Sequence, residues 1–370
     1  MAFTEKDILA ALGRVMEPEL HRDLVTLNMV KDIKISGNNL SFVIELTTPA
    51  CPLKDVMEKD ARAELAKIPG MGKVSIEWSS NVLANAKVRT TLQVPVKNII
   101  AVASGKGGVG KSTVSVNLAI ALSKLGARVG LLDNDVYGPN VPIMLGLPTA
   151  QLSRDGKESI YSVETKDGKL IPMEKYGIKV MSIAFAYPIE QPLVWRGPML
   201  HAAIRQFLQD VTWGELDYLI VDMPPGTGDA QLSLGQVVQG AMGIIVTTPQ
   251  LVSMSDALRG LNAFEQMNIP IIGVVENMGP YTDPSTGAKV AMFGEGGGQR
   301  LATMKNTPFL GSVPLDPMIR VGGDSGKPVI VASPESQTSQ RIMEIAKQVA
   351  ARVSVLNFKG EGAVPITITN

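Results

Sequence analysis

Cysteine is nearly absent from this chain of 370 residues, in which Cys51 is the single example. One cysteine excludes an internal disulfide framework and leaves a free thiol, which fits a reducing compartment. No uncharged apolar stretch approaches the roughly 20 residues that a membrane-spanning helix requires, and the acidic N-terminus shows no apolar signal region. We therefore expect a cytoplasmic protein without a membrane partner.

An excess of charge of either sign is also missing. Lys and Arg together number 35, as do Asp and Glu, so the formal net charge is zero. Such a balance gives no electrostatic reason to expect a nucleic-acid or acidic-lipid partner. Aromatic residues make up only 5% of the chain, whereas hydrophobic residues make up 45%, and this composition suits an α/β core.

The chain does contain a glycine-rich loop with two lysines at residues 105–112, which matches G-x-x-x-x-G-K-[ST]. The apolar run at 98–103 predicts a buried strand before it, and the apolar spacing of 112–125 predicts a helix after it. Backbone N–H groups at such a helix start wrap nucleotide phosphates, whereas a flexible surface turn rarely falls in this context. The expected phosphate-binding residues are Gly105, Lys106, Gly107, Gly108, Val109, Gly110, Lys111, Ser112 and Thr113.

Further apolar runs alternate with helical stretches, which predicts a mostly parallel sheet covered by helices on both faces. Residues 151–179 interrupt this rhythm and predict a β-hairpin insertion, and a helix that opens at Ser333 closes the pattern. The other buried strands are expected at Val129–Leu132, Tyr218–Val221, Gly243–Thr247 and Ile271–Val275.

The N-terminal part predicts a small α+β unit. Thr4 is expected to cap a first helix, strands are expected at 31–35, 40–46 and 74–78, and a helix at 54–67. The expected organisation is a small α+β domain at 1–83, a linker at 84–96, a P-loop ATPase domain at 97–358 and a C-terminal tail at 359–370.

Acidic motifs follow two of the predicted strands, at the sheet edge where open α/β folds place ligands. Asp133 and Asp135 lie one residue apart, and such carboxylates face a magnesium ion or an attacking water. A solvated acidic turn is the alternative. Asp222 closes its strand in the Walker B pattern and offers the oxygen that magnesium needs. Gly226 follows and is expected to bring a backbone N–H to the γ-phosphate.

Two further residues are candidates for a base site. Asn277 follows the strand that ends at Val275, and Pro314 lies in a later motif at 313–317. An asparagine amide offers the donor and acceptor pair that an adenine edge requires. A plain cap at the strand end is an equally open interpretation of Asn277.

Together these motifs resemble a known family. Lys106 in the loop, Asp-Asn-Asp-Val-Tyr-Gly-Pro at 133–139, Trp-Arg-Gly-Pro-Met at 195–199 and Asp-Met-Pro-Pro-Gly-Thr-Gly-Asp at 222–229 look like the Mrp/ApbC iron–sulfur carrier ATPases. These belong to the MinD/ParA class of deviant P-loop NTPases. The likeness runs from about residue 97 to the C-terminal helix. It implies a slow ATPase whose ATP lies between the subunits of a homodimer.

The resemblance also implies roles for single residues. The extra lysine, Lys106, would reach across to the partner subunit's nucleotide, while Asp135 would orient the attacking water and Asn277 would read adenine. Lys111 and Ser112 would bind phosphate and magnesium. The implied catalytic residues are Lys106, Lys111 and Asp135, and the implied magnesium-supporting residues are Ser112, Asp133 and Asp222.

Cys51 lies between a predicted strand and a predicted helix. A helix N-terminus lowers the pKa of a nearby thiol and favours the thiolate, although a single cysteine is often a small buried hydrophobe. Its segment at 47–55, with Pro-Glu-Leu at 18–20 and Leu-Asn-Met-Val at 27–30, is similar to the small iron–sulfur assembly domain of SufT and PaaD proteins. That resemblance implies that Cys51 ligates a transient iron–sulfur cluster.

One departure from the family concerns the cluster ligands. Many Mrp-type carriers place Cys-Pro-x-Cys after the Asn-Met motif, where this chain has Asp-Pro-Ser-Thr at 283–286. A cluster generally takes four thiolates, whereas a homodimer of this chain supplies two, both from Cys51. His21 is a possible further ligand, with an exposed loop histidine as the alternative.

Three functions are weighed. The first is an ATP-hydrolysing homodimer that takes iron–sulfur clusters from an assembly scaffold and transfers them to apoproteins. The second is a ParA/MinD-like positioning or scaffold ATPase without a cluster, whose usual basic patch or C-terminal amphipathic helix is missing here. The third is a reductase that couples ATP to electron transfer, which needs cluster cysteines in the ATPase domain, and the sequence has none there.

Overall fold

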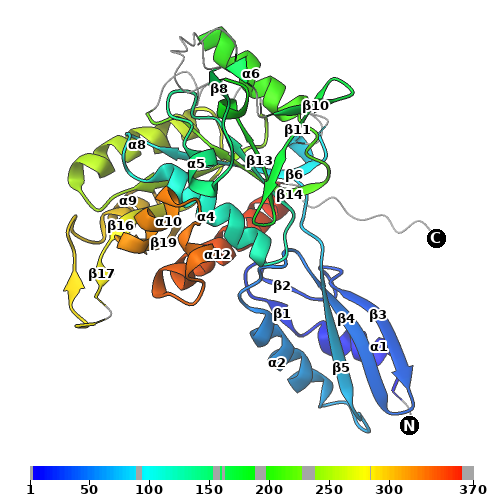
Figure 1. Cartoon of the computed structure of the whole chain (residues 1–370). Helices are drawn as coiled ribbons and strands as arrows, with labels where there is room; N and C mark the ends of the chain where they lie inside the picture. The colour runs from blue at the N-terminus through cyan, green and yellow to red at the C-terminus, as the bar shows by residue number, and fades with distance from the viewer. Residues whose placement is uncertain are drawn as a thin grey trace. The chain divides into compact units, whose positions relative to one another are not determined.

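The computed structural model describes residues 3–88, 94–152, 159–160, 163–187, 197–226, 238–283 and 285–360. The chain divides into two compact units, one of residues 1–83 with 350–370 and one of residues 84–349 (Figure 1). Parts of three motifs singled out in the sequence lie outside the described residues: 195–196, 227–229 and 284.

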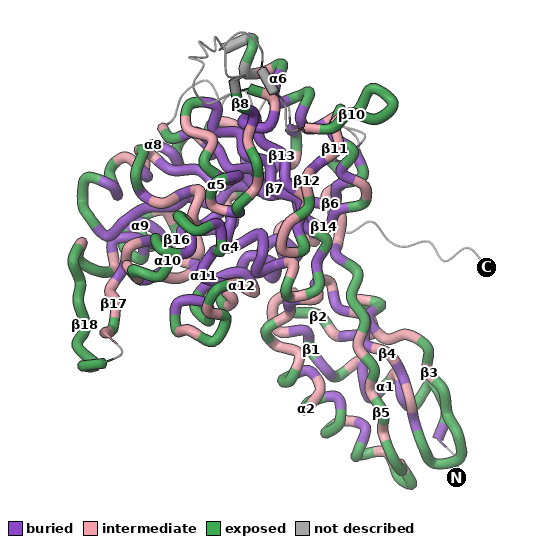
Figure 2. The backbone as a smooth tube through the Cα atoms, viewed as in Figure 1, coloured by how far each residue is buried: buried purple, intermediate pink, exposed green. Residues whose placement is uncertain are grey.

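The larger unit is built on an eight-stranded, mostly parallel sheet, as predicted. Its central strands are buried along their whole length (Figure 2), because continuous apolar runs suit a sheet covered by helices. In spatial order the strands are β12 (Met173–Lys175), β13 (Ile178–Ser182), β7 (Val129–Asp133), β14 (Leu216–Asp222), β6 (Val96–Ser104), β15 (Met242–Thr247), β16 (Ile271–Gly279) and β19 (Phe309–Pro314). All neighbours are parallel except β12 and β13.

Helices pack against this sheet, with α4 (Lys111–Lys124) on β6, β7 and β14, α8 (Leu251–Gln266) on β15, and α9 (Gly297–Met304) on β16 and β19. The last helix, α12 (Gln337–Gly360), starts later than the expected Ser333, because Ser336 accepts a hydrogen bond from the Ser339 N–H and caps it. The remaining helices are α5 (Val141–Leu145), α6 (Gly197–Gln209), α10 (Pro317–Asp324) and α11 (Val329–Ala332).

The expected insertion at 151–179 is only partly a separate hairpin. Strands β10 (Glu164–Lys166) and β11 (Lys169–Ile171) form an antiparallel hairpin, and β8 (Gln151–Leu152) pairs with β9 (Ser159–Ile160). The following segment is different, since β12 and β13 extend the main sheet beyond β7. The prediction of a separate hairpin was wrong for this segment. Strand β12 is short and mostly polar, so its sequence gives no indication that it pairs with the main sheet.

The smaller unit has the predicted α+β fold. Thr4 caps α1 (Glu5–Leu12) in a reciprocal pair with Asp7. The alternating apolar residues of β4 bury Phe42 and Ile44 against the helices. The other elements are β1 (Met16–Glu17), β2 (Arg22–Asp23), β3 (Val30–Ser36), β4 (Asn39–Leu46), α2 (Lys54–Leu65) and β5 (Val74–Ser80), and the sheet order is β3-β4-β5.

The end of α12 belongs to this smaller unit rather than to the expected domain at 97–358. Ser354 Oγ donates to Thr47 Oγ1 at 2.7 Å, and Asn357 Nδ2 donates to the Leu83 carbonyl at 3.1 Å. These bonds account for the grouping of residues 350–360 with 1–83.

Candidate nucleotide-binding site

The glycine-rich loop joins β6 to α4, as the sequence predicts. Gly108 and Gly110 adopt φ values of +80° and +81°, which residues with side chains rarely tolerate. Gly110 is the N-cap of α4, so the helix begins at Lys111 with its first N–H groups open toward the loop. The loop therefore has the backbone that phosphate binding requires.

The first glycine of the loop serves a different purpose. A Cβ atom on Gly105 would lie 2.1 Å from the carbonyl of Asp256 in α8. Only glycine allows α8 to lie directly on the phosphate-binding loop, so this helix and the loop form one packed layer.

Three side chains meet at the fully buried carboxylate of Asp222. Ser112 Oγ and Ser115 Oγ each donate to it at 2.6 Å, and Lys111 Nζ lies 2.8 Å away. The Lys111 side chain is only 6% exposed, so its charge is stabilised by this carboxylate and by Asp135 at 3.7 Å. The sequence-predicted Lys111, Ser112, Asp135 and Asp222 are thus brought together.

Asp133 and Asp135 have different partners although only one residue separates them in the sequence. Asp133 is fully buried and accepts hydrogen bonds from Ser182 Oγ at 3.0 Å and from the Val141 and Asp135 N–H groups at 3.3 Å. Burial and the charge of Asp222 raise the pKa of Asp133. Burial also raises the pKa of Asp135, and Lys111 opposes this shift. Asp135 is the carboxylate closer to the lysine, whereas Asp133 holds the turn in place.

Lys106 and Gly226 are not part of this cluster. The Lys106 carbonyl accepts from Ser104 Oγ at 2.9 Å, and its half-exposed ammonium group contacts no partner within the described ranges. The Gly226 N–H donates to the Ser104 carbonyl at 3.0 Å. This hydrogen bond would have to break before the same N–H could donate to a phosphate, as we expected from the sequence.

A cavity of about 380 Å³ opens beside the loop and contains both candidate base-site residues, Asn277 and Pro314. Asn277 Nδ2 donates to the Val109 carbonyl at 2.9 Å, which ties the end of β16 to the loop. Met278 follows with φ of +58°. The cavity is lined by Gly110, Thr113, Asn140, Ile143, Met144, Asn277, Met278, Pro314, Leu315, Asp316, Ile319, Arg320, Gly323 and Asp324.

Several residues of the site were missed by the sequence analysis. Ser115 lies one helical turn after Ser112, and this spacing was the available signal for a second hydroxyl on Asp222. Ser182 is the last residue of β13, a strand the sequence did not reveal. Arg320 and Asp324 of α10 form an ion pair at 2.8 Å and line the cavity. No pattern in the sequence pointed to these two residues.

The expectation of a readily formed thiolate at Cys51 is wrong. The half-buried Cys51 packs against the core of the smaller unit. Burial raises the pKa of its thiol to about 11, and the charges of Glu19 and Glu17 add to the shift. The hydrogen bond from the Leu53 N–H, near the start of α2, acts in the opposite direction but is outweighed.

The other candidate cluster ligands are His21 and the segment at 283–286. His21 is exposed, with φ of +53°. Within the described ranges, no three His, Cys, Asp or Glu side chains are grouped as a metal site. At the position where the family resemblance led us to look for a cysteine pair, Asp283 accepts hydrogen bonds from the Ser285 and Thr286 N–H groups.

Comparison with known sequences shows which protein family contains this site. Residues 95–350 match the family model of the NUBPL iron-transfer P-loop NTPases, which spans more than half of the chain. The chain belongs to this NUBPL-type P-loop NTPase family. Residues 5–78 match the model of the iron–sulfur cluster assembly protein. Both predicted resemblances are therefore confirmed.

Relatives of this NUBPL-type NTPase align over nearly the whole chain. It is 47% identical over 355 residues to an iron–sulfur cluster carrier protein of Synechocystis, covering 95% of this chain and 98% of that protein. It is 48% identical over 349 residues to a protein of the same name from Deinococcus radiodurans, covering 94% and 95%. The chloroplastic Fe–S cluster assembly factor HCF101 of Arabidopsis is 39% identical over 349 residues, covering 92% and 63%.

A solved structure is also similar. The nucleotide-binding protein of Archaeoglobus fulgidus in complex with ADP is 36% identical, with a TM-score of 0.55, over 69% of this chain and 96% of that one. Within the part of the chain that the structure describes, no helix is both long and apolar enough to span a membrane.

Proposed function

We propose that this chain is a slow, ATP-hydrolysing homodimer that accepts iron–sulfur clusters from an assembly scaffold in the cytoplasm and transfers them to apoproteins. The observation that carries the proposal is the buried cluster of Lys111, Ser112 and Asp222 at the start of α4. It lies in a chain whose other unit matches an iron–sulfur assembly domain.

The residues present fit a magnesium ion. Ser112 Oγ and the Asp222 carboxylate converge within 2.6 Å, and oxygen donors of this kind are what the ion prefers. Ser112 and Asp222 would hold it, and when bound it would neutralise phosphate charge. Asp133 is engaged by Ser182 and Val141, so we assign it the supporting role of fixing the turn that leads to Asp135.

Lys111 would exchange partners when a nucleotide binds. Its ammonium group now contacts two carboxylates, at 2.8 Å and 3.7 Å. Phosphate oxygens offer the same charge, so Lys111 would exchange its ion pairs with Asp222 and Asp135 for contacts with the phosphates. Asp135 is then released to accept a hydrogen bond from the attacking water, as general bases in phosphoryl transfer do.

The partnerless ammonium group of Lys106 supports its assignment to the second subunit's nucleotide. A cation that reaches a neighbouring active site stabilises the charge that develops during phosphoryl transfer. Closure of two subunits around ATP would couple hydrolysis to a change in dimer geometry.

The iron–sulfur cluster is the cargo in this proposal. Two copies of Cys51 give two thiolates, half of the usual ligand set, so the remaining positions stay open to a client protein or a small thiol. Since the pKa of Cys51 lies near 11, each thiol must release a proton when it binds the cluster. Weak retention of this kind suits transfer rather than storage.

Anaerobic reconstitution with iron and sulfide, followed by transfer to an apo-ferredoxin, tests the proposal. We expect visible absorption from a bound cluster in the wild-type protein and none in Cys51→Ala. Equal absorption in both proteins would contradict the role of Cys51. ATP-dependent recruitment to membrane or nucleoid fractions, without any cluster, would favour a positioning ATPase instead.

A further inference from the structure

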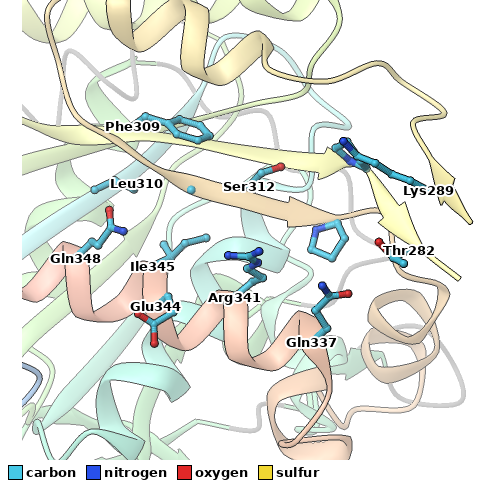
Figure 3. A pocket seen from close by; sticks show the side chains of 13 residues that line it. Thr282, Lys289, Phe309, Leu310, Ser312, Gln337, Arg341, Glu344, Ile345 and Gln348 are labelled. Atoms are coloured by element: carbon cyan, nitrogen blue, oxygen red, sulfur yellow. The ribbon is translucent and has the colours of Figure 1, made fainter. Parts of the chain in front are cut away.

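A second cavity, of about 400 Å³, lies between strand β19 and helix α12 (Figure 3). One end is bordered by the hairpin of β17 (Tyr281–Thr282) and β18 (Lys289–Val290), which contributes Thr282 and Lys289. Five of the six β19 residues line it, together with one face of α12. We call this cavity the β19–α12 groove.

Strand β19 is the last strand of the eight-stranded sheet on this side. Within the described ranges β16 is its one strand neighbour, so its other edge carries backbone groups without a strand partner. Gly311 has φ of +134°, and a Cβ there would lie 2.9 Å from Ile345 Cγ1. Glycine at this position lets α12 lie close beside the strand, which gives the groove a helix wall and a strand wall.

The charged side chains in and around the groove have a net charge of +1, which comes from Arg341. Lys289 pairs with Glu295 at 2.5 Å, and Glu344 pairs with Lys347 at 2.8 Å, so these four charges cancel. Arg341 is exposed and makes no hydrogen bond or ion pair with any described residue.

The polar groups of α12 are directed toward the strand. Figure 3 shows Arg341 and Gln337 extending from α12 toward β19, whereas Glu344 is directed away. Gln348 adds a further amide to the same wall. A guanidinium group and two amides thus line the wall of the groove that lies opposite β19.

We propose that the β19–α12 groove binds an extended, acidic segment of a partner polypeptide by strand addition to β19, with a carboxylate of that segment on Arg341. Main-chain hydrogen bonds to an open edge supply affinity in such complexes, and side-chain pockets supply specificity. A guanidinium group forms strong, directed bonds with a carboxylate. A small anion would use Arg341 alone and would leave the five β19 residues that line the groove without a role.

The groove shares Pro314 with the cavity beside the phosphate-binding loop, but Arg341 lines the groove alone, so the proposal is tested with the full-length protein and a synthetic peptide in the absence of nucleotide. The probe is a fluorescein-labelled nine-residue peptide that alternates Val with Glu and Thr. We expect saturable binding by fluorescence anisotropy, at least tenfold weaker for Arg341→Glu. Lys124→Glu makes the same change in charge at the exposed end of α4 and should stay within twofold of wild type.

Two further measurements distinguish strand addition from simple charge attraction. Methylation of alternate backbone nitrogens in the peptide, which keeps its charge, should weaken binding at least tenfold. Hydrogen exchange should slow at 309–313 in β19 and remain unchanged at the opposite edge strand, β12. Absence of saturable binding, equal binding of a peptide with Lys in place of Glu, equal binding by Arg341→Glu, or competition by free glutamate as effective as by unlabelled peptide would overturn the proposal.

Discussion

The two units of this chain differ in what surrounds the functional side chain of each. In the larger unit, Lys111 and Asp222 are both buried and neutralise one another at 2.8 Å. In the smaller unit, burial raises the pKa of the half-buried Cys51, and the charges of Glu19 and Glu17 add to the shift, so its thiol stays protonated. The nucleotide site is thus ordered by its own charges, whereas the thiol requires a positively charged ligand to become a thiolate.

The largest effect is expected when Lys111 is replaced. In Lys111→Ala we expect ATP affinity to fall by about 100-fold or more, because a charge-assisted contact to phosphate is lost. The buried Asp222 would also lose its cation, at a cost of about 3–5 kcal/mol in the free energy of unfolding. Calorimetric titration and urea denaturation measure these two effects.

A double variant separates the two consequences. Lys111→Ala with Asp222→Asn should regain most of the lost stability without regaining ATP binding, since the carboxylate that lay closest to the missing ammonium group is then a neutral amide. Lys124→Ala, at the exposed end of the same helix, is the matched control and should change neither quantity. Wild-type ATP affinity in Lys111→Ala would rule out our assignment of this lysine.

Lys106 tests whether the site is complete within one subunit. We expect Lys106→Ala to bind ATP within about threefold of wild type but to hydrolyse it about 100-fold more slowly, as when a cation in trans is removed. Mixing Lys106→Ala with a Lys111→Ala subunit should restore part of the activity, because each mixed dimer has one intact site. An unchanged kcat would exclude the role in trans.

Replacing Cys51 tests the role of the smaller unit. Cys51→Ser should bind at least tenfold less iron after reconstitution, since the hydroxyl is a poor ligand for a soft cluster. Its ATP affinity should remain within about twofold of wild type, because Cys51 lies in the other unit. Iron analysis and calorimetric titration provide the two readings, and a parallel loss of both would show that the units do not act separately.

The smallest effect concerns the acidity of the thiol. With a pKa near 11, Cys51 should react with iodoacetamide about tenfold faster for each unit of pH from 7 to 10, because the thiolate fraction rises in that proportion. Glu19→Gln removes a negative charge, so the pKa should fall and alkylation at pH 8 should become about two- to threefold faster. Glu77→Gln, which is exposed, is the control. A plateau in the wild-type rate below pH 9 would contradict the raised pKa.

The sequence was sufficient where local pattern decides structure. The apolar runs at 98–103 and 218–221 became buried parallel strands, and the glycine-rich loop joins a strand to a helix, as its sequence context indicated. Lys111, Ser112 and Asp222 were predicted to share a site because strand ends meet at one edge of a parallel sheet.

Where contacts between distant segments decide the outcome, the sequence was insufficient. The helix start near Cys51 suggested a low pKa, but burial of the thiol against the core raises it, and the carboxylates that add to the shift lie more than 30 residues upstream, at Glu17 and Glu19. Likewise, nothing in the spacing of Asp133 and Asp135 reveals that Ser182 engages one of them and Lys111 approaches the other.

The close approach of Asn277 to the phosphate-binding loop limits how this protein can be engineered. A Cβ on Gly110 would lie 2.0 Å from Asn277 Nδ2, and the same amide donates to the Val109 carbonyl. We propose that this cavity takes the base of the nucleotide, so trimming Asn277 to admit an enlarged purine analogue should also loosen the phosphate-binding loop. On the same proposal, trimming Met278 or Ile319, which line the same cavity, should accommodate the analogue with less effect on the loop.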